Sequence, residues 1–311
     1  MKALRRPISG VLLLDKHADL SSNTAVGWSK RLFNAQKAGH TGTLDPFATG
    51  LLPICFGEAA KFARFMLDAE KGYRATLKLG QKSSTGDTEG DIIETRHVAV
   101  DREKVDAVLS RFLGAQTQIP PMHSALKQDG VALYKLARQG LEVARAPREI
   151  EVLSLSVVSF AADELVIDTR VTKGTYIRVL AEDIGEALGC GAYLTALRRT
   201  STGGFGLEQA VTLETLDAMT LAQRDATLLP ADALAMALQR VDLDAVAAKA
   251  LQNGQVPTVP VPSFSIRPVD AAQFRAYGEF EVFLGVATAS ECSATSAKLT
   301  ALRLMSPETP I

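Results

Sequence analysis

The sequence predicts an α+β fold, in which a mixed sheet carries helices on its face and a small β-rich domain follows at the C-terminus. Strand patterns and helix patterns are interspersed along the first 240 residues, without the steady strand–helix–strand rhythm of a doubly wound fold. From residue 241 the chain becomes rich in Pro and polar residues. The 311 residues are 47% hydrophobic and 22% charged, an ordinary globular composition with material for about two domains.

The first 80 residues predict two strands, two helices and a loop. GVLLLD (10–15) is a short apolar run after a glycine, as expected for a strand, and SSN (21–23) can cap the helix that follows it. Residues 39–53 contain three Gly and two Pro and therefore predict a loop. Apolar residues at helical spacing predict a helix over 58–70, and apolar–polar alternation predicts a half-buried strand over 73–80.

The next hundred residues predict turns, helices and strands in alternation. Turn-forming residues fill 81–91. The clearest helix, 101–114, begins with a capping aspartate and ends at a glycine. Alternation predicts a strand over 164–172, and the segment KGTYIRVLAEDIGEALG (173–189) acquires helical spacing from Ile177 onward.

The C-terminal third changes in character. An Ala-rich stretch (231–250) predicts a helix, and two strand-like runs, 279–288 and 298–305, follow a Pro-rich segment. We therefore expect one domain over residues 1–240 and a second, small β-rich domain over residues 241–311. The alternative is that the C-terminal residues extend the same domain.

The net charge of −1 hides an uneven distribution. Residues 1–80 carry 12 Lys and Arg against 6 Asp and Glu, whereas residues 201–250 carry 3 against 7. A basic N-terminal part suits a polyanion such as nucleic acid, and an unevenly charged solvated surface is the alternative. The sequence has neither a run of about 18 apolar residues nor the apolar core of a signal peptide, so we expect a cytoplasmic protein without a membrane span. Three scattered cysteines (Cys55, Cys190 and Cys292) predict neither a disulfide framework nor a zinc site.

The most distinctive local feature is the segment GHTGTLDPFATGLLP (39–53). Pro46 disfavours the α region for the residue before it and so holds Asp45 in an extended conformation. The glycines permit unusual dihedral angles and the close approach of another backbone. A loop that holds one carboxylate, Asp45, and one imidazole, His40, has the residue types of a functional site. The alternative is a structural turn in which Asp45 accepts hydrogen bonds from nearby N–H groups.

Several enzyme classes lack their motifs in this chain. Asp15 follows an apolar run, as in phosphotransferases with an aspartyl nucleophile, but these need a second acid two residues later, where His17 stands. TGTLD differs from the phosphorylated loop of ion pumps, in which the Asp precedes the TGT. The motifs GxxxxGK[ST], HExxH and GxSxG are absent, so neither a P-loop, a zinc protease nor an α/β-hydrolase is predicted.

Five segments carry a resemblance to a known family. They are GVLLLDK (10–16) with SSN (21–23), GHTGTLDPFATGLLPICFGEAAK (39–61), KGYRATLKLG (71–80) with its polar TGDTEGD turn, IPPMHSALKQDGVALYKLARQG (119–140) and KGTYIRVLAEDIGEALGCGAYLTALRRTSTGGF (173–205). In this order they resemble the TruB family of bacterial tRNA pseudouridine-55 synthases. The resemblance covers residues 10–215. Beyond these residues, only the length and the β-rich sequence pattern match the family's C-terminal PUA-like domain.

The resemblance implies both a fold and a domain organisation. Residues 1–240 would form the pseudouridine-synthase catalytic domain, with a mixed, largely antiparallel sheet flanked by helices. Residues 241–311 would form a PUA-like RNA-binding domain. The chain departs from the family pattern at His17, where proline is usual, and at His123, where an aromatic residue is common. Neither departure affects the expected nucleophile, so both bear on RNA contacts and not on the reaction.

The resemblance further implies isomerisation of uridine 55 in the T-loop of tRNA. This reaction breaks the C1′–N1 bond, turns the base and rejoins it through C5. It involves no redox change and no energy source, so we expect no cofactor and no metal. The chemistry needs one ionised carboxylate, and a free Asp, with a pKa near 3.9, is ionised at neutral pH. The resemblance assigns this role to Asp45. Whether Asp45 attacks the sugar carbon, attacks the base or abstracts a sugar proton stays open.

The resemblance assigns substrate binding to five residues: His40, Tyr73, Tyr176, Arg178 and Leu197. Arg178 is the expected partner of Asp45, because a buried carboxylate is costly unless it is paired. Tyr73 is expected to stack on the target base and Leu197 to pack beneath it. The base must leave the folded T-loop, at a cost of a few kcal/mol, and His40 is expected to fill the gap.

A spacing of two residues predicts where Tyr176 lies relative to Arg178. On extended chain, side chains two residues apart point to the same side. We therefore expect the start of KGTYIR to lie in extended chain, with the helix beginning after it.

The implied partner is tRNA, bound through its T-arm by a monomer without an obligatory protein partner. A non-catalytic RNA-binding protein on the same scaffold is one alternative, but it would be free to lose Asp45, Arg178 and Tyr73. An RNA-guided pseudouridine synthase of the dyskerin type is the other. Such enzymes carry lysine-rich tails, whereas this chain ends in MSPETPI.

Overall fold

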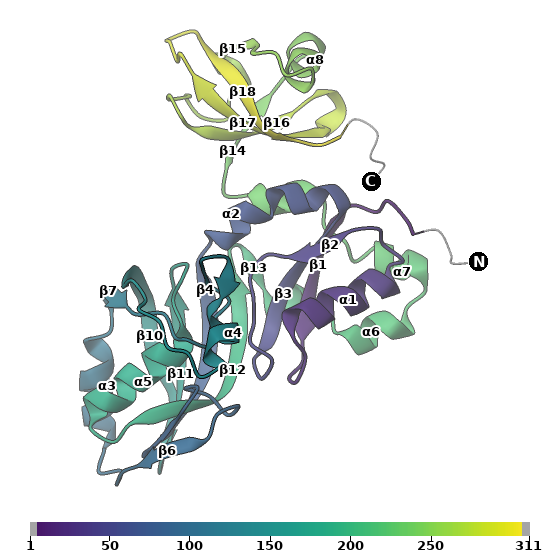
Figure 1. Cartoon of the computed structure of the whole chain (residues 1–311). Coiled ribbons are helices and arrows are strands. Elements are labelled where there is room, and N and C mark those ends of the chain that lie inside the picture. Colours follow the sequence, from purple (N-terminus) through teal and green to yellow (C-terminus); the bar gives the residue numbers. More distant parts are fainter. Residues whose placement is uncertain (1–4, 307–311) are drawn as a thin grey trace.

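The structure is a computed structural model that describes residues 5–306, and two β-sheets dominate it (Figure 1). The larger sheet contains nine strands and the smaller one five, and two short two-stranded sheets lie outside them. No helix in the described range is long and apolar enough to cross a membrane.

The larger sheet is built from the first two thirds of the chain. Its strands are β1 (Gly10–Lys16), β2 (Ala38–His40), β3 (Thr49–Phe56), β4 (Lys71–Leu79), β7 (Gly114–Gln118), β10 (Arg148–Ala161), β11 (Glu164–Val171), β12 (Ala192–Thr202) and β13 (Phe205–Gly206). They run in the order β1-β3-β12-β4-β11-β10-β7, with β2 on β3 and β13 on β12. All pairs are antiparallel except β3 with β12. The predicted mixed, largely antiparallel sheet flanked by helices is therefore confirmed.

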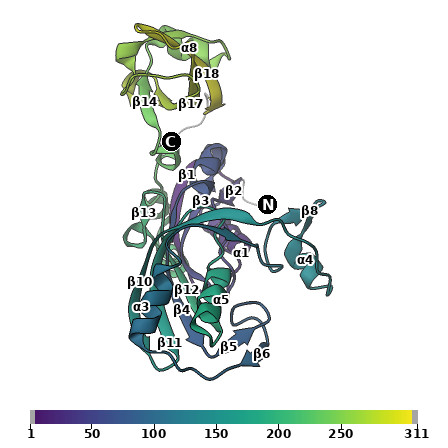
Figure 2. The same ribbon diagram turned by 90° about the vertical axis from the view of Figure 1, so that its left-hand side faces the viewer.

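Helices cover the larger sheet in two groups. The helices of the first two thirds of the chain are α1 (Ser22–Leu32), η1 (Gly57–Phe62), α2 (Ala63–Leu67), α3 (Arg102–Ser110), α4 (Leu133–Ala137), α5 (Ile177–Leu188), η2 (Leu207–Gln209), α6 (Leu213–Ala218) and α7 (Leu221–Asp225). α3 and α5 lie side by side, with α5 against β12 and β4 (Figure 2). α1 packs against β2, β3 and α6. Their apolar faces close one core, in which Leu12, Phe33, Leu77 and Ile184 are completely buried.

The smaller sheet holds the C-terminal part of the chain. It runs in the order β14 (Gln239–Asp242), β16 (Gln273–Tyr277), β17 (Phe283–Ser290), β18 (Ser296–Leu304) and β15 (Thr258–Pro260). Near it lie η3 (Ala231–Ala235), α8 (Ala245–Gln252), η4 (Val261–Ser263) and η5 (Glu279–Glu281). The sheet has a core of its own around Val241, Phe274 and Leu299. It begins at Gln239, two residues before the expected C-terminal domain, whose independent folding stays a prediction.

An apolar cluster joins the two sheets. The ring of Phe62 in η1 lies 5.1 Å from that of Phe283 in β17, and Leu234 of η3 packs in the same cluster. The Tyr277 hydroxyl donates a hydrogen bond of 2.6 Å to Asp232. The C-terminal sheet therefore rests on η1 and η3 through buried side chains.

Four expected elements were wrong in part. Residues 49–53, expected as loop, begin the central strand β3, because this run is almost fully buried between β1 and β12. The expected helix over 58–70 is the short pair η1 and α2 and ends at Leu67. The expected helix over 231–250 is interrupted by β14, which pairs with the distant β16. The strand expected from residue 279 begins only at Phe283, after a helical turn.

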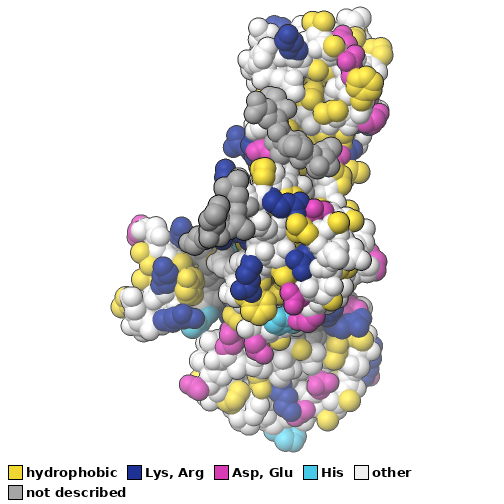
Figure 3. Space-filling view, turned by 90° about the vertical axis from the view of Figure 1, so that its right-hand side faces the viewer, with side chains coloured by type: hydrophobic (Ala, Val, Ile, Leu, Met, Phe, Trp, Pro, Cys, Tyr) yellow, Lys and Arg dark blue, Asp and Glu magenta, His cyan; other side chains and the backbone are white. Residues whose placement is uncertain are grey.

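Two small hairpins project beside the main sheet. One pairs β5 (Gln81–Ser83) with β6 (Ile92–Thr95), and the other pairs β8 (Lys127–Gln128) with β9 (Val131–Ala132), just before α4. The second hairpin and α4 form the insert, residues 119–140, which stands out from the body as a lobe (Figure 2). Lys and Arg side chains lie on this lobe and on the neighbouring body (Figure 3).

Candidate active site

Asp45 lies in the connection between β2 and β3, beside the one parallel strand pair of the larger sheet. The Asp45 carbonyl accepts a hydrogen bond of 3.1 Å from the Ala48 N–H, which closes a tight turn. Ser22, the first residue of α1, holds the residue before Asp45. Its hydroxyl donates to the Leu44 carbonyl and accepts from the Leu44 N–H, both at 2.8 Å. The position of Asp45 is thus tied to the start of α1.

A buried lysine holds the other side of Asp45. Lys16, at the end of β1, is completely buried, and its Nζ donates to the carbonyls of His17, Leu20 and Pro46 at 2.9, 2.7 and 3.1 Å. Burial lowers the pKa of Lys16 to about 8. The three carbonyls link β1, the start of α1 and the residue after Asp45.

A buried arginine holds the preceding part of the loop. Arg199 in β12 is 1% exposed and donates to the Leu51 carbonyl through Nε at 2.6 Å. Its Nη atoms donate to the carbonyls of Thr43 and Gly42 at 3.4 and 3.2 Å. Together with Ser22 and Lys16, Arg199 therefore fixes the backbone on both sides of Asp45.

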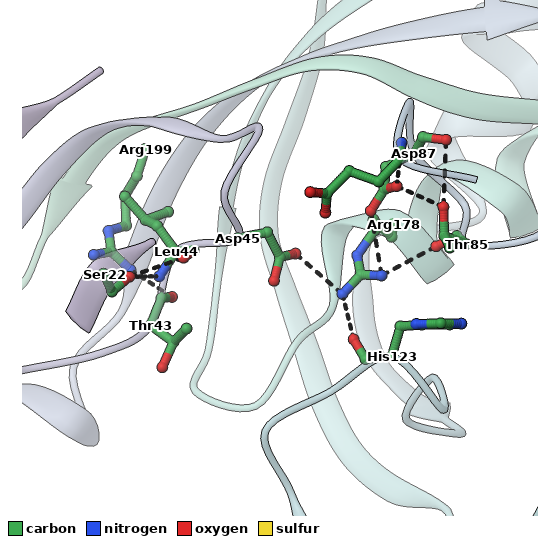
Figure 4. Close-up of polar contacts among 10 residues, drawn as sticks. Ser22, Thr43, Leu44, Asp45, Thr85, Asp87, His123, Arg178 and Arg199 are labelled. Carbon is green, nitrogen blue, oxygen red and sulfur yellow. Dashed lines mark hydrogen bonds and ion pairs between the residues drawn. The ribbon is translucent and has the colours of Figure 1, made fainter. Parts of the chain in front are cut away.

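Arg178 lies between two carboxylates (Figure 4). Its Nη2 is 3.0 Å from Oδ2 of Asp45, and its Nη1 is 3.3 Å from Oδ2 of Asp87. The same guanidinium donates to the carbonyls of Thr85 and His123 at 3.0 and 2.6 Å. Because Arg178 is 5% exposed, these four acceptors satisfy a charge that is nearly removed from water.

The two carboxylates differ in their surroundings. Asp87 is 1% exposed, and its Oδ1 accepts from the Thr85 hydroxyl at 2.5 Å and from the Glu89 N–H at 3.0 Å. Asp45 keeps 35% of its side chain exposed, so it can reach a bound molecule. Burial raises the pKa of Asp45, the Arg178 charge opposes this shift, and the Asp87 charge adds to it, so that the pKa lies above its ordinary value.

Tyr176, near the start of KGTYIR, is extended as expected, but Arg178 lies in a helix and does not share a strand face with Tyr176. α5 begins at Ile177, and Tyr176 is its extended N-cap. The Gln118 side chain causes this arrangement, because it accepts from the Tyr176 N–H at 2.8 Å and donates to the Tyr176 carbonyl at 3.1 Å. The Gln118 side chain therefore ties Tyr176 to the end of β7, and Arg178 lies in the first turn of the helix.

A cleft of about 630 Å³ opens above Asp45. Its volume lies in the range typical of ligand sites. One wall is the start of α1, a second is the 85–89 turn, and a third is the insert, which contributes Tyr134 and Arg138. The Arg138 guanidinium lies 5.5 Å from the centre of the Tyr134 ring, and this pair faces the carboxylates across the cleft.

The structure places the predicted site residues in two layers. His40 and Arg178 line the cleft together with Asp45. The Nδ1 of His40 accepts from the Gly42 N–H at 3.2 Å, and burial together with the Arg199 charge lowers the pKa of His40.

Tyr73, Tyr176 and Leu197 are not among the residues that line the cleft, and Tyr73 and Leu197 lie in the sheet beside the loop. Tyr73 in β4 lies opposite Arg199 of β12, and Leu197 lies opposite Ala75, so Tyr73 and Leu197 share one face. Both are buried, at 8% and 7% exposure, and belong to the main core. Because Arg199 also holds Gly42, Tyr73 stands next to the Asp45 loop.

Sequence reasoning missed four residues that shape the site: Lys16, Ser22, Asp87 and Arg199. All four lie within the segments that carried the family resemblance, but their roles depend on contacts with distant parts of the chain: backbone atoms for Lys16, Ser22 and Arg199, and the Arg178 guanidinium for Asp87. Within residues 5–306, no group of three or more His, Cys, Asp or Glu side chains is arranged to hold a metal ion.

Comparison with known proteins places this chain in a family. The TruB family pseudouridylate synthase N-terminal domain matches residues 30–177, and the tRNA pseudouridylate synthase B C-terminal domain matches residues 178–242. A protein of Burkholderia mallei (strain NCTC 10247) named tRNA pseudouridine synthase B is 52% identical over 290 residues, which cover 92% of this chain and 95% of that protein. This chain belongs to the TruB family.

Two further similarities extend this TruB-family assignment. The tRNA pseudouridine synthase B of Nitrosospira multiformis is 51% identical over 289 residues, or 91% of this chain and 92% of that protein. The crystal structure of a Cbf5-Nop10-Gar1 complex contains a chain that matches with a TM-score of 0.73 and 26% identity, covering 96% of this TruB-family chain and 85% of that one. The α+β architecture described above is thus shared with a solved protein.

Proposed function

We propose that this TruB-family enzyme isomerises uridine to pseudouridine at position 55 in the T-loop of tRNA. The ion pair between Asp45 and Arg178, at the floor of an open cleft, is the observation that carries the proposal. A carboxylate that is held by a guanidinium but still partly exposed can react with a nucleotide that enters the cleft. The related proteins named tRNA pseudouridine synthase B support tRNA as the substrate.

Asp45 is the proposed catalytic group, and Arg178 keeps it oriented and ionised. Only one side of Asp45 faces the guanidinium, so the other side is available to the sugar or the base of the target nucleotide. Arg178 remains paired with Asp87 whatever Asp45 does, which keeps the guanidinium in place during the reaction. Ser22 and Lys16 donate hydrogen bonds to the backbone on either side of Asp45, and these bonds keep the loop in place during the reaction.

The other predicted residues receive the roles that the family resemblance implies. His40, in the cleft wall, fills the space left by the flipped base. Tyr73 and Leu197, on one face of β4 and β12, form the surface against which the uracil ring stacks, and Tyr176 borders it beside Arg178. Aromatic platforms of this kind are typical of proteins that read unstacked RNA bases.

We further propose that the enzyme acts in the cytoplasm as a monomer, without a cofactor, a metal or an obligatory protein partner. Residues 241–311 would act as a PUA-like RNA-binding domain beside the catalytic domain of residues 1–240. The separate core of the smaller sheet supports this division.

Incubation with unmodified tRNA transcript tests the proposal. We expect pseudouridine at position 55, mapped at nucleotide resolution, in a reaction that contains only the purified protein and the tRNA. The Asp45→Asn protein is the matched control and is expected to leave the transcript unmodified. An RNA-binding protein without activity would bind the transcript and modify nothing, and a guide-dependent enzyme would modify it only after a guide RNA is added. Either result would reject the proposal.

A further inference from the structure

Glu89 stands apart from the other carboxylates that line the cleft. Asp45 and Asp87 are both paired with Arg178, whereas no side-chain hydrogen bond or ion pair of Glu89 occurs within residues 5–306. Glu89 is also exposed, while Asp87 is completely buried. A free carboxylate therefore stands at the rim of a cleft proposed to bind a polyanion.

The backbone around Glu89 is held firmly. The Glu89 N–H donates to Oδ1 of Asp87 at 3.0 Å, and Asp87 in turn contacts Arg178. The next residue, Gly90, packs so closely that a Cβ atom would lie 2.6 Å from the Ser84 hydroxyl and 2.5 Å from the Thr85 hydroxyl. Glu89 is thus linked through Asp87 and Arg178 to Asp45. The fold therefore sets the position of the Glu89 carboxylate relative to the reacting nucleotide.

The charges around Glu89 restrict the kind of chemical group that its carboxylate can contact. Desolvation and the charges of Asp87 and Asp45 raise the pKa of Glu89, and the charges of Arg178 and Arg138 oppose this shift. Phosphate groups would add to this repulsion, and they have Arg138 on the opposite wall as a favourable partner. A carboxylate only accepts hydrogen bonds, so its complement in RNA is a donor, either a base N–H group or a ribose 2′-hydroxyl, and of these only the base groups differ between nucleotides.

The position of Glu89 at the rim of the cleft indicates which base of the RNA it contacts. Asp45, at the floor, must meet the uridine that is isomerised, and Glu89 at the rim then meets a nucleotide next to it. Cytosine, adenine and guanine carry an exocyclic amino group, whereas uracil carries none. We propose that Glu89 selects an amino-bearing base at a nucleotide adjacent to the target uridine. This inference rests on the proposed function and names a specificity residue within the same site.

The test compares short stem-loop RNAs in single-turnover reactions. The nucleotide before the target uridine and the nucleotide after it are varied one at a time. Each is replaced by cytidine, by uridine or by the cytidine analogue that lacks the 4-amino group. For the wild type we expect a roughly tenfold higher rate constant with cytidine at one of the two positions, the size of effect expected for one specific base contact. The analogue without the amino group should behave like uridine.

Glu89→Gln should reduce this preference to within about twofold, because an amide can donate to the O4 of uracil as well as accept from an amino group. Asp91→Asn is the matched control. Asp91 is exposed in the same turn but does not line the cleft, so its amide variant loses the same charge and should retain the preference.

Two outcomes would overturn the inference. Glu89→Gln could keep the wild-type ratio between cytidine and uridine at both positions, which would mean that Glu89 contacts neither base. Alternatively, it could lose activity equally on every RNA, which would place Glu89 in the reaction and not in base selection. A wild-type protein that modifies none of the RNAs would instead contradict the proposed function, so the two failures are distinguishable.

Discussion

Arg178 and Asp45 form an ion pair of 3.0 Å in which the arginine is buried and the carboxylate is partly open to the cleft. This asymmetry allows Arg178 to orient Asp45 without covering it. The guanidinium does not depend on Asp45 for its own compensation, because Asp87 and two backbone carbonyls also contact it. Several expected consequences of this arrangement can be measured.

Asp45→Asn should abolish turnover while tRNA affinity stays within a few fold of the wild type. The substitution removes the charge but keeps the shape and most hydrogen-bonding capacity of the side chain. Pseudouridine formation and tRNA binding by filter retention check the two parts. Multiple turnovers by this variant, once deamidation has been excluded by mass spectrometry, would mean that Asp45 is not the catalytic group.

Arg178→Met should lose most of the activity and also lower the stability. Asp87 would remain buried without its cation, and breaking a buried pair in this way typically costs ~3–5 kcal/mol. Thermal unfolding measures the loss. Adding Asp87→Asn to Arg178→Met should restore part of the stability, because the uncompensated charge is removed, but should not restore activity. An Arg178→Met protein that melts and reacts like the wild type would contradict the role of the pair.

The activity should decline on the acid side at a higher pH than a free Asp would give. In the proposed reaction the ionised form of Asp45 is the active one, and burial and the Asp87 charge raise its pKa. Activity is therefore lost as the pH falls through that raised pKa, above the value near 3.9 of a free side chain. Asp87→Asn removes one source of the shift, so its acid limb should move to lower pH. Single-turnover rates against pH check the direction, and a move to higher pH would contradict it.

Tyr73→Phe separates two roles of the tyrosine next to the Asp45 loop. If the ring only stacks on the uracil, the variant should keep a rate within a few fold of the wild type, whereas Tyr73→Ala should lose most activity. Because Tyr73 belongs to the main core, we expect Tyr73→Ala also to be destabilised by several kcal/mol, as is usual for a buried aromatic residue. A rate loss in Tyr73→Phe comparable with that of Tyr73→Ala would show that the hydroxyl takes part in the reaction.

A chain that ends at residue 240 should still isomerise its target but bind tRNA more weakly and melt at a lower temperature. The truncation removes five basic residues (Lys249, Arg267, Arg275, Lys298 and Arg303), and it also uncovers Phe62, which packs on Phe283. Fewer phosphate contacts give a shallower dependence of affinity on salt, by about 0.7 per contact for single strands.

A salt series with whole tRNA and with a minimal T-arm stem-loop measures this effect. The isolated Phe283→Ala substitution in the full chain is the control for stability, because it opens the contact without removing any basic residue. Unchanged affinity and salt dependence in the truncated chain would show that residues 241–311 do not bind RNA.

Several strands, among them β1, β4 and β11, and the main helices α1, α3 and α5 could be predicted from the sequence alone, as could a loop that holds Asp45. Their signals are local: the apolar run of β1, the alternation of β4, the stripe of α5, and a carboxylate before Pro46 in a glycine-rich loop. Each depends on residues within a few positions of one another, so spacing and residue type are sufficient. The pairing of Asp45 with Arg178 was also expected, but through the family resemblance and not from any local pattern.

The detailed construction of the site depends on contacts that local patterns do not contain. Lys16 and Arg199 hold the Asp45 loop through backbone carbonyls, which every residue possesses, so no residue type marks their partners. The helical position of Arg178 was mispredicted because Gln118, from a strand about 60 residues earlier, fixes Tyr176 as the N-cap. Asp87 becomes a second partner of Arg178 only because the fold buries both in one place, where neither charge is stable without the other.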